Sequence, residues 1–91
     1  MNAVNNSELS AFLQAGWHKT EIITAKNGDQ TIYQGKCAGS SGDETLPIWC
    51  IKKITITTNA DVQTIVEKFA DGSMSFSYTW NDRANLTYKY L

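Results

Sequence analysis

The feature that most constrains the fold is a series of strand-like runs that begins at Trp17. Each run is rich in β-branched and aromatic residues, and turn residues divide the runs at regular intervals. Asn27-Gly28 is the strongest turn signal, because both residues accept the positive φ of a tight hairpin turn, and Asp71-Gly72 is a second. The pattern predicts an antiparallel meander of about six strands, at residues 18–25, 30–38, 48–58, 62–70, 73–80 and 86–91.

The expected strand at 73–80 has the clearest pattern in the chain. Large side chains alternate with serine or threonine without exception, which predicts one face in the core and the other in water. The large residues are Met74, Phe76, Tyr78 and Trp80. On this basis Phe76→Ala is expected to cost about 3 to 5 kcal/mol and Ser75→Ala far less. The last run repeats the alternation and has few charges, so it should pair with another strand; its large residues are Leu86, Tyr88 and Tyr90.

The run at 48–58 changes its apolar face along its length. Trp49 and Ile51 share one face, whereas Ile54 and Ile56 lie on the other. We expect a β-bulge near Lys52-Lys53, because one extra residue would bring the two halves onto the same face.

At 91 residues, the chain can form one domain with one core. An all-β meander this small buries its apolar face by curling into a barrel or by folding into a two-layer sandwich. We therefore expect a single small antiparallel sheet of this kind at residues 17–91, preceded by an N-terminal arm or short helix at residues 1–16.

The helical signal lies at residues 7–16, which end at Gly16 and carry Leu9, Phe12 and Leu13 on one side. A helix this short does not hold itself together in isolation. It must dock on its own sheet or on a neighbouring subunit.

The charge balance is close to neutral, with 8 Lys and Arg against 9 Asp and Glu and a net charge of -1. The broad basic field typical of nucleic-acid-binding proteins is absent. The longest nearly uninterrupted apolar stretch, residues 46–51, is far shorter than the roughly 20 residues that span a bilayer, and no signal peptide is visible. We expect no nucleic-acid partner, no membrane association and synthesis in a cytosol.

Cys37 and Cys50 are the two cysteines, and a cytosolic origin favours buried, reduced thiols over a disulfide. Two cysteines with one distant histidine do not supply four zinc ligands at a usual spacing. The glycines are too loosely spaced for a phosphate-binding loop. The sequence thus predicts neither a metal site nor a cofactor.

Catalytic groups are scarce. His18 is the only histidine, and the sequence offers no partner that would orient it as a general base. Asp71 and Asp82 could be a carboxylate pair of the glycosidase kind, but both stand in turn signatures, where Asp bonds to nearby backbone. We expect a protein that is not an enzyme.

Arg83 is the only arginine and stands three residues after Trp80. We expect its guanidinium to clamp the last turn to the sheet, with an inter-subunit anchor as the alternative. Most of the Trp and Tyr area is expected in the core rather than on a sugar-binding platform, which leaves Tyr88 and Tyr90 open for a partner surface. The candidate interface residues are Phe12, Leu13, Arg83, Tyr88 and Tyr90.

Four motifs between residues 30 and 91 carry a resemblance to a known family. They are Tyr33-x-Gly35-x-x-Ala38, Trp49-x-Ile51-Lys52-Lys53-Ile54, Ala70-Asp71-Gly72 with Phe76 and Trp80, and Asp82-Arg83-Ala84 with Leu86 and Tyr88. In these motifs the chain resembles small virion-associated proteins encoded by tailed bacteriophages.

The resemblance implies an all-β structural or accessory protein of the virion, present in many copies as a capsid cement or decoration protein or as a tail or neck component. Its partners would be other virion proteins and copies of itself, and it would join the virion after synthesis in the host cytoplasm. Two alternatives stay open. One is a carbohydrate or receptor-binding module, suggested by the three Trp and four Tyr residues, and the other is a small inhibitor of a host protein, suggested by size and charge.

Overall fold

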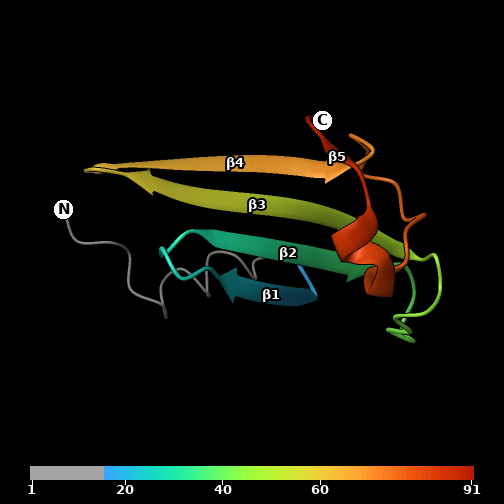
Figure 1. Cartoon of the computed structure of the whole chain (residues 1–91). Helices are drawn as coiled ribbons and strands as arrows, with labels where there is room; N and C mark the ends of the chain where they lie inside the picture. The colour runs from blue at the N-terminus through green and yellow to red at the C-terminus, as the bar shows by residue number, and fades with distance from the viewer. Residues whose placement is uncertain (1–15) are drawn as a thin grey trace.

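The computed structural model describes residues 16–91. The helix expected over residues 7–16 therefore lies outside the described residues except for Gly16, and so do Phe12 and Leu13 of the candidate interface. The described part contains one antiparallel sheet whose five strands follow the order of the sequence (Figure 1). These strands are β1 (Lys19–Thr24), β2 (Gln30–Cys37), β3 (Trp49–Asn59), β4 (Val62–Ala70) and β5 (Tyr88–Lys89). The predicted all-β antiparallel meander is confirmed, with one strand fewer than expected.

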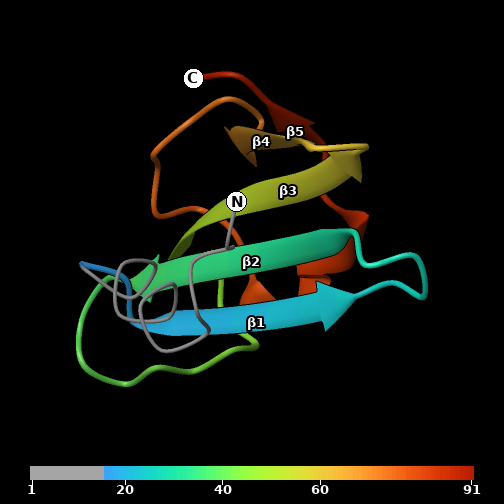
Figure 2. The same cartoon turned by 90° about the vertical axis from the view of Figure 1, so that its left-hand side faces the viewer.

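The sheet is open rather than closed into a barrel. Each strand pairs with its neighbours in the sequence, and β1 and β5 stand at the two ends of the strand order. The 3-10 helix η1 (Trp80–Asn85) lies behind β1 and β2 in Figure 2, on one side of the sheet. We call this side of the sheet the η1 face. The main core is closed by the segment that carries η1, which packs onto this face.

The strand predicted at 73–80 does not form. Tyr78 makes an isolated bridge to Trp49, and Trp80 begins η1. Met74 and Phe76 are 44% and 43% exposed, so the prediction that they lie in the core is wrong. The expected large cost of Phe76→Ala loses its basis.

Two features of the structure explain this difference. The place beside the end of β4 is occupied by β5, because Phe69 pairs with Lys89 and Ala70 pairs with Tyr88. In addition, Ser75 donates its backbone N–H to Ser73 Oγ (3.0 Å), and such local bonds compete with a β ladder. Asp71-Gly72 does form the expected tight turn, with φ of 51° and 69°, but the chain leaves the turn without pairing back onto β4.

The predicted bulge in β3 is also absent. The register of β3 is continuous through Lys52 and Lys53 on both sides, towards β2 and towards β4. The change of apolar face has another cause, namely that β3 runs through the middle of the sheet and buries side chains on both faces. The main cluster on the η1 face contains Tyr33, Trp49, Ile51, Ala70 and Trp80, and a smaller cluster on the opposite face contains Ile32 and Ile54.

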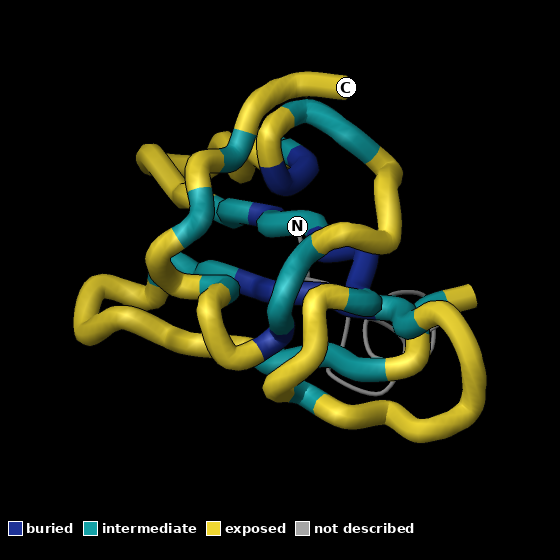
Figure 3. Tube along the Cα trace, turned by 90° about the vertical axis from the view of Figure 1, so that its right-hand side faces the viewer, coloured by how far each residue is buried: buried dark blue, intermediate teal, exposed yellow. Residues whose placement is uncertain are grey.

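Trp80 anchors the main cluster. Its side chain is 1% exposed and lies 5.5 Å, centroid to centroid, from the ring of Trp49. Gly35 of β2 allows this close approach, because a Cβ there would lie 2.7 Å from two atoms of the Trp80 ring. Figure 3 shows the buried residues in dark blue along the inner part of the fold, with exposed loops around them.

Cys37 and Cys50 are both free thiols. Cys37 lies opposite Trp49 and Cys50 opposite Lys36 in the β2–β3 register, so the two side chains point to opposite faces of the sheet. Burial raises the pKa of the Cys50 thiol. This arrangement keeps the two thiols apart, in agreement with the expectation of reduced cysteines, but only Cys50 is buried as expected, because Cys37 is partly exposed.

Candidate interaction surface

Arg83 joins η1 to the far end of the sheet. Its Nε and one terminal nitrogen donate to the two carboxylate oxygens of Glu21 on β1, at 2.9 and 2.7 Å. The other terminal nitrogen donates to the carbonyl of Trp80 (3.1 Å), and the guanidinium lies 4.7 Å from the centroid of the Trp80 ring. The Arg83 hydrogen bonds hold the pKa of Glu21 below its ordinary value. This geometry is the clamp that the sequence suggested. It occupies the guanidinium donors that the alternative role, an anchor to a neighbouring subunit, would need.

Tyr88 and Tyr90 lie at the same end of the fold but in different surroundings. Tyr88, on β5, is partly buried and donates its hydroxyl proton to the carbonyl of Arg83 (2.7 Å). Burial raises the pKa of this phenol. Tyr90 is 68% exposed, and its ring lies 5.0 Å from the Nζ of Lys68. The structure thus brings Tyr88 against Arg83, whereas Tyr90 lies beside Lys68 and is the one most open to a partner.

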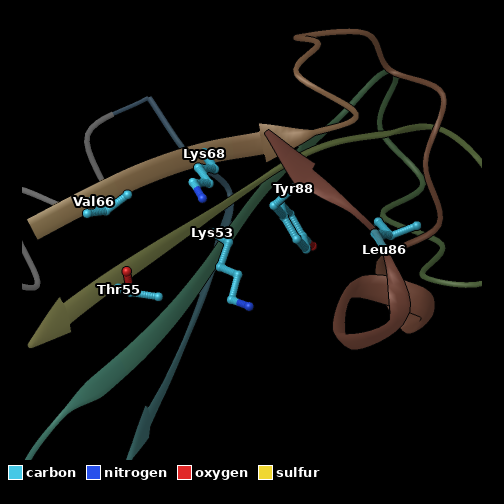
Figure 4. A pocket seen from close by; sticks show the side chains of 6 residues that line it. All are labelled: Lys53, Thr55, Val66, Lys68, Leu86 and Tyr88. Carbon is cyan, nitrogen blue, oxygen red and sulfur yellow. The ribbon is translucent and has the colours of Figure 1, made fainter. Parts of the chain in front are cut away.

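A hollow of about 190 Å³ opens on the η1 face next to Tyr88 (Figure 4). Two neighbouring strands supply most of its lining, and the segment after η1 supplies the rest. Its lining residues are Lys53, Thr55, Val66, Lys68, Leu86 and Tyr88. We call it the lysine hollow, because two of its six residues are lysines that lie directly opposite each other in the β3–β4 register.

Neither lysine of the hollow has a carboxylate partner within residues 16–91. The ion pairs in that part of the chain are Lys19–Glu44, Lys52–Glu67 and Arg83–Glu21. Lys53 instead places its Nζ 5.6 Å from the centroid of the Tyr88 ring, and Lys68 lies near Tyr90. Aromatic rings attract an ammonium but leave its charge in place. The hollow therefore holds two partly buried, uncompensated positive charges.

Sequence reasoning missed this pair. Lys53 and Lys68 are fifteen residues apart and resemble ordinary strand lysines. The one signal available was the turn at Asn59-Ala60-Asp61, which sets the register of the hairpin and so places the two residues opposite each other.

The outer edge of β4 is largely uncovered. β5 pairs with Phe69 and Ala70, and among residues 16–91 no strand pairs with the outer side of β4 between Val62 and Lys68. Asp71 donates its backbone N–H towards β5, to the carbonyl of Thr87 (2.8 Å). Since the direction of backbone N–H groups alternates along a strand, those at residues 63, 65 and 67 point to the same open edge.

Exposed apolar side chains accompany this edge. Val62 and Ile65 are 63% and 65% exposed. An edge strand with free backbone groups and apolar side chains is a template for pairing with another chain. We call residues 62–68 of β4 the open edge.

His18 and Cys37 form a contact that the sequence did not indicate. His18 Nδ1 accepts the backbone N–H of Cys37 (3.1 Å), and the Cys37 sulfur lies 3.8 Å from the same nitrogen. Because the backbone bond uses the Nδ1 lone pair, that nitrogen is poorly placed to take a proton from the thiol. The contact fastens the start of β1 to the end of β2.

The remaining candidates of the sequence occupy structural positions. Asp71 lies in the turn after β4 and Asp82 in the first turn of η1. The prediction of core aromatics is confirmed at Tyr33, Trp49 and Trp80, which are nearly fully buried. Within the described part of the chain, no group of three or more His, Cys, Asp or Glu side chains could hold a metal ion, and no helix is long and apolar enough to cross a membrane.

Comparisons of the chain with protein-family models, with curated proteins and with solved structures found no match.

Proposed function

We propose that this protein is a non-enzymatic structural or accessory component of a tailed-bacteriophage virion, in the capsid decoration or in the tail or neck. It acts through contacts with other virion proteins and with copies of itself. The sequence motifs between residues 30 and 91 support the virion assignment. The open edge of β4 is the observation that carries the mode of action.

Strand addition is the contact that the open edge favours. Added strands gain affinity from main-chain hydrogen bonds and specificity from alternate side chains. Many monomeric proteins protect an edge with proline, with several charges or with a very short strand. Residues 62–68 contain no proline, and the exposed Ile65 stands in the middle of the open edge.

The chemistry of the surface agrees with a binding role. His18 Nδ1 is engaged by backbone, and the Arg83 guanidinium is engaged by Glu21. The lysine hollow and the open edge are among the described features that combine accessible groups with unsatisfied bonding capacity.

Mass spectrometry of purified virions tests the assignment to the particle. The protein should be present in multiple copies in particles freed of soluble lysate proteins. Its absence from such particles would contradict the virion role.

The mode of action is tested by Ile65→Pro, with Ile65→Ala as the matched control. Both variants remove the exposed side chain, but proline also removes the N–H that points to the open edge and leaves the β3 ladder intact. We expect Ile65→Pro to lose incorporation into particles and Ile65→Ala to retain most of it. Equal incorporation of both variants would show that main-chain pairing at this edge is not used.

A further inference from the structure

We propose that the lysine hollow is a binding site for a carboxylate, specifically the side chain of a glutamate or aspartate in an acidic segment of a partner protein. The inference rests on the proposed role in protein–protein contacts and identifies the chemistry of the partner.

Lys53 and Lys68 lie directly opposite each other on adjacent strands. Like charges in this position destabilise a sheet. Both side chains are partly buried, which reduces the screening of their repulsion by water. No carboxylate within residues 16–91 relieves this repulsion. The carboxylate nearest in the sequence, that of Glu67, pairs instead with Lys52 (3.0 Å). A group with negative charge that enters between the two ammonium groups would remove this cost.

The size of the hollow indicates a side chain rather than a free cofactor. Its volume is about 190 Å³, whereas sites for small molecules and cofactors usually measure about 300 to 1,000 Å³. The walls also fit an amino-acid side chain. Val66, Leu86 and the ring of Tyr88 supply apolar surface for a methylene stem, while Lys53, Lys68 and the Thr55 hydroxyl supply polar contacts for a carboxylate head.

The position of the hollow makes it reachable by a polypeptide. Lys68 is part of β4 and the last residue of the open edge, so a segment lying along that edge passes beside the hollow. The walls favour a carboxylate on a stem over a phosphate, because a nucleic-acid backbone has no apolar stem to fill them. The net charge of -1 likewise provides no field that would attract nucleic acid.

A synthetic peptide supplies the test. We would titrate the labelled protein, at low ionic strength, with a capped peptide of alternating Thr and Glu and follow the backbone amide signals by NMR. The matched peptide carries Gln in place of Glu. Saturable shifts are expected at Lys53, Lys68 and Tyr88 with the Glu peptide, and they should be absent with the Gln peptide.

Two protein variants locate the binding. Lys68→Gln should weaken binding of the Glu peptide about tenfold, as expected for the loss of one charge-assisted contact. Lys26→Gln is the control, because Lys26 is exposed in the β1–β2 turn and its substitution changes the net charge by the same amount. An equal loss in both variants would mean nonspecific charge attraction and would overturn the proposal.

Two further outcomes are decisive. The proposal of a carboxylate site would be contradicted if inorganic phosphate or a short oligonucleotide bound at the hollow with higher affinity than the Glu peptide. Ile65→Pro separates this inference from the proposed function, because it blocks pairing at the open edge and leaves both lysines in place. Free glutarate should still bind at the hollow in Ile65→Pro, even if this variant is not incorporated into virions. If glutarate binding is lost in Lys68→Gln but kept in Ile65→Pro, the site is supported independently of the virion role.

Discussion

Gly35→Ala tests whether the close packing of Trp80 against β2 determines the stability of the fold. On general grounds the substitution should stabilise the protein, because glycine loses more conformational entropy on folding than alanine, worth about 0.4 to 1 kcal/mol. The structure predicts the opposite sign. An alanine Cβ would lie 2.7 Å from two atoms of the Trp80 ring and 2.9 Å from the Trp49 ring.

The magnitude follows from the burial of these rings. Trp80 and Trp49 are 1% and 3% exposed, so neither can turn into solvent to make room. Overpacking of this kind typically costs about 1 to 3 kcal/mol, and the entropy gain offsets part of it. We expect Gly35→Ala to lower the free energy of unfolding by about 1 to 2 kcal/mol, measured by urea unfolding with tryptophan fluorescence and far-UV circular dichroism.

A double-mutant cycle identifies the cause. Trp80→Leu removes the two indole atoms nearest the added Cβ, so Gly35→Ala should cost less in that background than in the wild type. The expected coupling is about 0.5 kcal/mol or more. Our reasoning would be refuted if Gly35→Ala stabilised the wild-type protein, or if its cost were the same in both backgrounds.

Three further predictions use the same unfolding assay. Phe76→Ala should cost only about 1 kcal/mol or less because the side chain is 43% exposed, whereas Trp80→Ala should cost about 3 to 5 kcal/mol; the reverse order would restore the core strand that the sequence suggested. Lys68→Glu should stabilise the protein by about 0.2 to 1 kcal/mol, since a carboxylate would then face the ammonium of the opposite strand, and a loss of stability would argue against repulsion in the hollow. Arg83 lowers the pKa of Glu21 in the folded state, so the Glu21 carboxylate stabilises the fold at pH values above its ordinary pKa, and this contribution is lost as the pH falls through the lower folded pKa. Glu21→Gln should therefore be less stable than the wild type at pH 7 by about 1 kcal/mol or less, and the two proteins should become equally stable in acid.

The sequence predicted the sheet well where the signals were local. Four strands lie close to their predicted bounds, and the chain turns at Asn27-Gly28 as predicted, although only Gly28 takes the positive φ, at 92°. Turn chemistry and β-branched runs act over a few residues, so they can be read without knowledge of the rest of the chain. The expected role of Arg83 as a clamp also rested on residues close to it in sequence, although its main partner, Glu21, lies 62 positions away.

The errors arose where two segments competed for one place. The run at 73–80 has the period of a strand, but a period does not specify a partner, and β5 occupies the edge beside Phe69 and Ala70. The bulge expected in β3 failed for a related reason. An apolar residue on the unexpected face suggests an irregularity only if one face is in water, and β3 buries residues on both.

The candidate surface shows the same division. The sequence named Tyr88 and Tyr90, of which the fold brings Tyr88 into contact with Arg83, but it gave little sign of the lysine hollow or of the open edge. The hollow depends on the β3–β4 register, for which the turn at Asn59-Ala60-Asp61 was the one local signal, and the open edge depends on the shortness of β5, which no local pattern encodes.

By itself, the sequence determined that this protein is an all-β antiparallel meander, because turn residues and strand-forming runs succeed one another along the chain. Only the tertiary structure decided which run completes the sheet, which face Trp80 closes, and that two lysines fifteen residues apart meet across a strand pair. The physical reason is that strand formation follows from local preferences, whereas pairing, burial and uncompensated charge depend on which distant residues come to lie side by side.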